Sequence, residues 1–423
     1  MELDVSTALS LHDIRYNTTP NSNGTYNMVR WDTDENITVN DSALEIIKLF
    51  AKGKSIGETA RILHTPLDEV FNLTQFLIRS AYVRSVGSHK IEDSSTPIHP
   101  WLHKVPLHWF SSLVSKPLMI FTFLYMVSGI LLGVLITKHI PSYIDFFWTE
   151  DLFFISIVGA VVGWGLVLTH ESAHFFVAKA VGAESTLRFS SRFFDLVMIT
   201  DHFHLAVLDK PFRYMVYLSG MYIDMLLAAT IYWVFIASWA FSVNLGILGP
   251  FLNSIFLSLV VGVVWEFNMY LETDTYNFFS DSLDQDNLYN NTKKYLYNRV
   301  RQWRNPLLIL LRDLLIRFMF SRKRLSETDD MRLFSPNERK IIHFFSIYYI
   351  IGLVVSTILF FTITLPRDIK FIGGSFGLLI VSISLGDAIG FVESLIIIIL
   401  AIFPNALLIN AIINKHRKHG SFV

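Results

Sequence analysis

The stretch that decides the fold is FFISIVGAVVGWGLVLTHESAH, residues 153–174. It joins an apolar run to a His-Glu-x-x-His motif in which His170 and His174 are four residues apart. On a helix such residues share one face, so the two rings can hold one metal ion, and Glu171 beside them is a candidate general base. Two histidines and a glutamate are costly at membrane depth, which favours a metal site over the alternative that the histidines only pack helices together.

The composition is that of a polytopic membrane protein. Of 423 residues, 52% are hydrophobic and only 17% are charged, below the quarter or so that is usual in soluble proteins. The absence of cysteine excludes disulfides, cysteine-ligated zinc and a cysteine nucleophile, so a zinc ion would need His and carboxylate ligands. The net charge of -1 gives no indication of nucleic acid as a partner. The first residues lack the basic and apolar regions of a signal peptide.

Apolar segments near 20 residues or longer predict a mainly α fold, a bundle of about six membrane spans. The predicted spans are residues 117–138, 152–181, 213–240, 247–271, 341–363 and 389–413. The shorter run 371–385 is interpreted as a re-entrant segment or an external loop. Thirteen Lys and Arg lie in residues 275–340. This bias predicts that both termini and the end of the second span lie in the cytoplasm, in a multi-pass protein of a bacterial plasma membrane.

Outside the spans, the pattern predicts an α+β cytoplasmic domain of winged-helix type at residues 1–95. Strands are expected at 26–31 and 36–40, helices at 43–51, 56–63 and 68–81, and a closing strand at 82–83. An interfacial linker follows at 96–116, then the membrane core at 117–274, the basic segment 275–340 with an amphipathic helix at 305–320, and C-terminal spans at 341–423. Alternation in 185–190 and 195–200 predicts a β-hairpin, whose edge could hold a peptide or which could be only a structural cover.

A catalytic zinc ion usually has three protein ligands, so the motif needs a third. The charge pattern places the end of the fourth span on the same side of the membrane as the two histidines, and Asp274 lies there. Glu272, His202 and His204 are competing candidates. Asp224, in an apolar run, can support the site or pair with a neighbour, but the sequence gives it no chemical role.

Residues 170–182, HESAHFFVAKAVG, resemble the motif helix of site-2-protease-like membrane zinc metalloproteases. Ser219, Gly220 and Ala228 are similar to the small-residue segment of their third span, and residues 268–281, NMYLETDTYNFFSD, resemble their second motif. The likeness covers roughly residues 150–300 and is greatest to the peptide zinc metalloprotease branch of modified-peptide gene clusters. It implies that Asp274 is the third zinc ligand and that Asn268 orients the substrate or stabilises the oxyanion. Thr275 stands where that branch has Gly, and the Pro after Asn268 is missing.

Residues 37–83 resemble PqqD-like domains, which bind leader peptides by strand addition. The expected function is therefore a zinc endopeptidase that cleaves a leader peptide or a small membrane-associated peptide at the cytoplasmic membrane face. Its expected partners are the peptide substrate, the lipid bilayer and an exporter or modifying enzyme of such peptides, with no nucleic acid. The alternatives are a structural or DNA-binding role for the N-terminal domain, and a transporter, immunity protein or inactive protease on the same scaffold.

Overall fold

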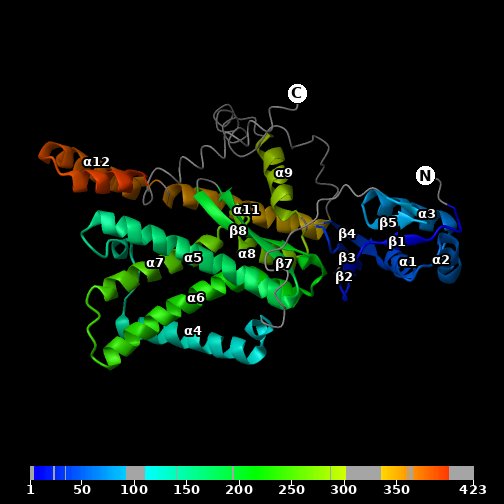
Figure 1. Cartoon of the computed structure of the whole chain (residues 1–423), viewed down its shortest axis with the longest axis horizontal. Helices are drawn as coiled ribbons and strands as arrows, with labels where there is room; N and C mark the ends of the chain where they lie inside the picture. Colours follow the sequence, from blue (N-terminus) through cyan, green and yellow to red (C-terminus); the bar gives the residue numbers. More distant parts are fainter. Residues whose placement is uncertain are drawn as a thin grey trace. The chain divides into compact units, whose positions relative to one another are not determined.

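The structure is a computed structural model that describes residues 4–21, 24–33, 35–91, 110–139, 141–192, 195–285, 287–301, 335–359, 361 and 365–399. Over these residues the protein is mainly helical, with small sheets near the N-terminus (Figure 1). Five of the described helices are long and apolar enough to cross a membrane. They are α4 (Lys116–Thr137), α5 (Leu152–Val181), α6 (Lys210–Ala240), α7 (Leu248–Glu266) and α11 (Pro336–Leu359).

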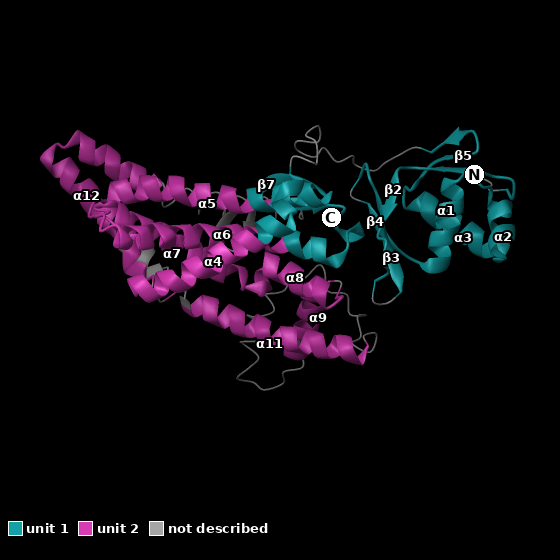
Figure 2. Cartoon of the chain, turned by 90° about the horizontal axis from the view of Figure 1, so that it is seen from below, with its two compact units in different colours: residues 1–119, 172–188, 200–216 teal, residues 120–171, 189–199, 217–423 magenta. Residues whose placement is uncertain are grey.

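The chain divides into two compact units (Figure 2). The first contains residues 1–119, 172–188 and 200–216, and the second contains residues 120–171, 189–199 and 217–423. The boundary passes through the continuous helices α5 and α6.

The strands of the N-terminal region form two small antiparallel sheets. One has the order β2 (Ile14–Tyr16), β3 (Thr25–Arg30), β4 (Asn36–Asn40), and the other has the order β1 (Leu9–Leu11), β5 (Val83–Val86), β6 (His89–Lys90). The predicted strands at 26–31 and 36–40 and the closing strand are confirmed as β3, β4 and β5. The prediction missed β1 and β2, because three-residue strands are too short to show an alternating pattern.

Three helices follow the strands where the sequence placed them: α1 (Asp41–Ala51), α2 (Ile56–Leu63) and α3 (Leu67–Arg79). The Asn40 side chain accepts a hydrogen bond from the N–H of Ala43, and Ser55 and Glu58 form a reciprocal capping box. These side chains bond N–H groups that the first helical turn leaves without a partner. The apolar faces of the helices pack on the sheets around a shared core that includes Leu44, Ile47, Phe50, Val70, Leu77 and Tyr82.

Close packing in the second unit depends on two glycines of α4. A Cβ atom on Gly133 would lie 2.2 Å from Cγ of Tyr232, and one on Gly129 would lie 2.6 Å from Nε1 of Trp233. Only glycine allows α6 to come this near, which is the small-residue packing typical of helices in membranes. The Trp233 indole N–H donates to the carbonyl of Tyr125 at 3.1 Å, so α4 also satisfies a partly buried polar group of α6.

Two span predictions change. Residues 371–385, expected to be a re-entrant segment or an external loop, are part of a continuous helix, α12 (Leu365–Leu385), so the loop alternative was wrong. The sixth predicted span is helical over Ala388–Ile399, and its remainder lies outside the described residues. The amphipathic helix expected at 305–320, most of the linker and the basic C-terminal end also lie outside them.

The hairpin predicted after the motif helix is confirmed. It consists of β7 (Glu184–Arg192) and β8 (Asp195–Phe203), which pair as a two-stranded sheet. Gly182, with φ of +94°, ends α5 and turns the chain toward β7. Beside this turn the ammonium of Lys179 donates to both carboxylate oxygens of Glu184, at 3.0 and 2.8 Å, and both side chains are buried. The hairpin is therefore joined tightly to the end of the helix that carries the motif.

Candidate metal centre

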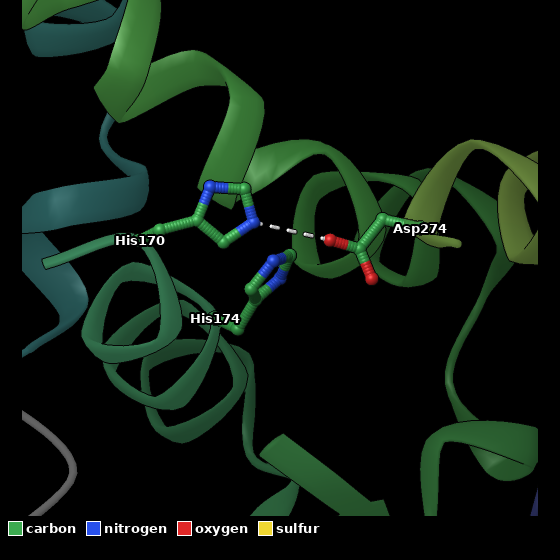
Figure 3. A group of neighbouring side chains, drawn as sticks. All are labelled: His170, His174 and Asp274. Carbon is green, nitrogen blue, oxygen red and sulfur yellow. Dashed lines mark hydrogen bonds and ion pairs between the residues drawn. The ribbon is translucent and has the colours of Figure 1, made fainter. Parts of the chain in front are cut away.

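Three of the predicted site residues come together in space. One ligand atom each of His170, His174 and Asp274 lies within 4.8 Å of the others. Figure 3 shows the two rings leaving α5 one turn apart and facing the carboxylate. Among the described residues this is the only group of histidine, cysteine, aspartate or glutamate side chains with metal-binding spacing.

The donor set fits a catalytic zinc ion. Two imidazoles and one carboxylate make up the three-ligand type that leaves a fourth position open. His170 Nε2 and Asp274 Oδ2 are 3.3 Å apart. In a tetrahedral site with bonds of about 2.0–2.2 Å, neighbouring ligand atoms lie about 3.3–3.6 Å apart. The observed distance is therefore one that two ligands of the same ion adopt.

The orientation of His170 is set by a buried carboxylate. Nδ1 of His170 lies 2.7 Å from Oδ2 of Asp224, whose residue is 5% exposed and belongs to α6. An ionised carboxylate only accepts, so Nδ1 is the ring nitrogen that donates to Asp224, and Nε2, which faces Asp274, is the nitrogen that would bind a metal ion. This is the carboxylate–histidine arrangement that orients ligands and raises their basicity in metal sites.

The orientation of His174 is set by the backbone instead. Its Nδ1–H donates to the carbonyl oxygen of Val216 at 2.8 Å, and the ring is almost completely buried. Nε2 is again the nitrogen left for a metal ion. Both histidines thus present the same ring nitrogen, but one is held by a side chain and the other by a peptide group.

Asp274 is held by the connection between α7 and α8 (Asp274–Ser282). The backbone N–H of Asp274 donates to the buried carboxylate of Glu266 at 3.0 Å, and Thr273 Oγ1 donates to the Glu266 carbonyl at 2.6 Å. These two bonds place Asp274 in the first turn of α8. Thr275 is helical and buried, and its hydroxyl lies 3.4 Å from Met221 Sδ, so this position does not require the glycine that the resemblance leads one to expect.

The remaining candidates do not belong to this group. Glu171 follows His170 in α5 and is half-buried. Glu272 is exposed, in a left-handed conformation with φ of +54°, and it is Asp274 that joins the histidines. Asn268 starts the 3-10 turn η5 (Met269–Leu271). The His202 ring centroid is 6.0 Å from that of His174, whereas His204 contacts the N-terminal domain.

Two further carboxylates lie beside the ligands: Asp224, which the sequence suggested only as a support for the site or a partner of some neighbour, and Glu266, which sequence reasoning missed. Their signal was visible, because Asp224 is an acidic residue inside an apolar helix and Glu266 is one at the end of such a helix, where a charge is rare unless it has a partner. Their partners were not visible, since Asp224 lies 54 residues from His170 in sequence.

Comparison with protein-family models, with curated proteins and with solved structures finds no match. The resemblance to site-2-protease-like enzymes therefore stays a prediction that rests on the motif residues.

Proposed function

We propose that this protein is a membrane-embedded zinc endopeptidase that cleaves a peptide precursor near the cytoplasmic membrane face. The observation that carries the proposal is the convergence of His170, His174 and Asp274 on one point, with Glu171 next to the first ligand. Five apolar helices support a location in the membrane. The donor set supports zinc over magnesium or calcium, which prefer oxygen ligands.

The chain's own residues divide the chemistry as follows. His170, His174 and Asp274 would hold the ion, which when bound acts as a Lewis acid toward water and the scissile carbonyl. Glu171 takes the proton of the attacking water and delivers it to the leaving amine. Asn268 is the proposed donor to the oxyanion or to the substrate backbone.

The proposed substrate is an extended peptide, such as a leader peptide or a small membrane-associated precursor. A protease cleaves an extended backbone, and the β7–β8 hairpin at the end of the motif helix offers strand edges for one. The small sheets of the N-terminal domain could present the precursor in the same way. An exporter or a modifying enzyme of such peptides is the proposed partner of the reaction.

The test compares the natural chain with Glu171→Gln, which keeps the size of the side chain and removes the base. Both are purified in detergent, their zinc content is measured, and each is incubated with a mixed-sequence peptide library that is read by mass spectrometry. We expect about one equivalent of zinc in both proteins and cleavage about 10²–10⁴-fold slower in the variant. Glu150→Gln, the same change at an exposed residue before α5, is the matched control and should cleave normally.

Two results would contradict the proposal. If Glu171→Gln cleaved peptides at the natural rate, Glu171 would not be the general base, and the proposed mechanism would be wrong. A natural chain that holds zinc but generates no new peptide termini, in the library or in cell membranes that contain it, would favour the transporter or the inactive protease instead.

A further inference from the structure

The N-terminal domain contacts the chain that immediately follows the β7–β8 hairpin. The His204 ring stacks on Trp31, with ring centroids 4.2 Å apart and planes 23° from parallel, and His204 Nε2 lies 3.1 Å from the Thr33 carbonyl. The guanidinium of Arg15 lies 3.4 Å from the centroid of the Trp31 ring. Two groups this close to one ring must occupy its opposite faces, so Trp31 is held between a cation and an imidazole.

Two further hydrogen bonds extend this contact. The Asn27 amide donates to the carbonyl of Ala206 at 3.0 Å, in the 3-10 turn η4 (Leu205–Val207). The Thr19 hydroxyl donates to a carboxylate oxygen of Asp209 at 3.0 Å. Asp209 directly precedes α6, so the N-terminal domain holds the chain from the end of β8 to the start of that helix. We call this contact, made by Thr19, Asn27, Trp31 and Thr33 with His204, Ala206 and Asp209, the joint.

The same segment of chain contacts the ring of His174, a proposed zinc ligand, at two places, one on each side of the joint. Two residues before His204, His202 has its ring centroid 6.0 Å from that of His174 and its Nδ1 3.1 Å from the Ser185 hydroxyl. Seven residues beyond Asp209, the carbonyl of Val216 accepts the hydrogen bond that orients His174. All of these residues belong to the first compact unit. The joint lies in the middle of the segment, between the two points that contact the His174 ring.

We propose that the N-terminal domain positions the metal centre: the joint fixes residues 201–216 so that the Val216 carbonyl and the His202 ring keep His174 in its ligand orientation. His204 is then a positioning residue and not a ligand. The inference rests on the proposed metal centre.

The test weakens the joint and measures zinc affinity by competition with a chromogenic chelator, using the full-length chain. His204→Asn removes the stacked ring, and asparagine tolerates the left-handed backbone of this position, where φ is +66°. His64→Asn is the matched control, because His64 is also left-handed, with φ of +51°, but is exposed at the end of α2. We expect His204→Asn to bind zinc about tenfold more weakly, at the low end of the roughly 10–100-fold effect of outer-shell partners. The control should not change.

A cross-link separates positioning from a direct role or from misfolding. The natural chain has no cysteine, so Thr19→Cys with Asp209→Cys creates a single thiol pair that a short bis-maleimide can join across the joint. The cross-link should form in high yield and should restore zinc affinity to the His204→Asn chain. Unchanged affinity in His204→Asn, a loss that the cross-link does not restore, or a thiol pair that fails to cross-link would each overturn the inference. A natural chain that holds no zinc would instead overturn the metal centre itself.

Discussion

The two histidines of the motif helix are oriented by acceptors of different kinds. His170 is backed by the side chain of Asp224, a charged acceptor at 2.7 Å. His174 is backed by the carbonyl of Val216, a neutral backbone acceptor at 2.8 Å. Both arrangements leave Nε2 for the metal ion, yet only the first one adds a negative charge behind the ligand.

The two acceptors therefore contribute differently: one supplies both orientation and negative charge, and the other supplies orientation alone. The Asp224 carboxylate orients His170 and would also contribute negative charge to balance the proposed divalent ion. The Val216 carbonyl fixes an angle without adding charge, and its position depends on where the chain before it lies. A substitution of Asp224 therefore removes the acceptor of His170 directly, whereas the acceptor of His174 is a backbone group that a substitution can displace but not remove.

The largest effect should come from removal of either ring. His170→Ala and His174→Ala should each reduce the zinc content of the purified protein from about one equivalent to near zero, because two remaining ligands bind zinc poorly. The two losses should be equal, since both rings present the same nitrogen. Metal analysis after gel filtration measures this. If one variant retained zinc and the other did not, the two histidines would not be equivalent ligands and the prediction would be wrong.

A smaller effect should separate the two acceptors. Asp224→Asn keeps the shape of the side chain but removes its charge, and we expect zinc affinity to fall about 10–100-fold. Val216→Ala changes only the side chain of the other acceptor, so it should lower stability, because Val216 is completely buried, but leave zinc affinity nearly unchanged. Chelator competition and thermal unfolding measure the two quantities. Equal losses of zinc affinity in the two variants would contradict the division of tasks.

Much of the fold could be predicted from local patterns. Apolar runs predicted the five long apolar helices to within five residues at each end, and also the start of the sixth expected span. Asn40 and Ser55 correctly marked the starts of α1 and α2. Local patterns were insufficient where pairing partners are distant. The three-residue strand β1 exists because β5, more than 70 residues away, pairs with it, and no sequence window contains both strands.

In the candidate site, too, residues with a local sequence signal could be predicted, whereas contacts between distant parts of the chain could not. His170 and His174 were evident from spacing alone, and Asp274 from the charge pattern of the loops together with a resemblance. The groups that hold these ligands were not evident. Asp224 could be noticed as a charge in an apolar helix, but the Val216 carbonyl could not, because every residue has a carbonyl and only the fold determines which one faces the ring.

The smallest effects on zinc affinity should come from substitutions of Glu266 and Glu272, the two glutamates that precede Asp274 in the sequence. These substitutions extend the comparison from the two histidines to the third proposed ligand. Glu266 accepts the backbone N–H of Asp274, and in Glu266→Gln an amide oxygen can still accept it. We expect zinc affinity to fall only about fivefold, since roughly 1 kcal/mol separates a charged acceptor from a neutral one. Glu272→Gln, the same change at an exposed residue outside the group, should leave zinc affinity unchanged. A larger loss in Glu272→Gln than in Glu266→Gln, measured with the same chelator, would make Glu272 the third ligand and would remove Asp274 from the site.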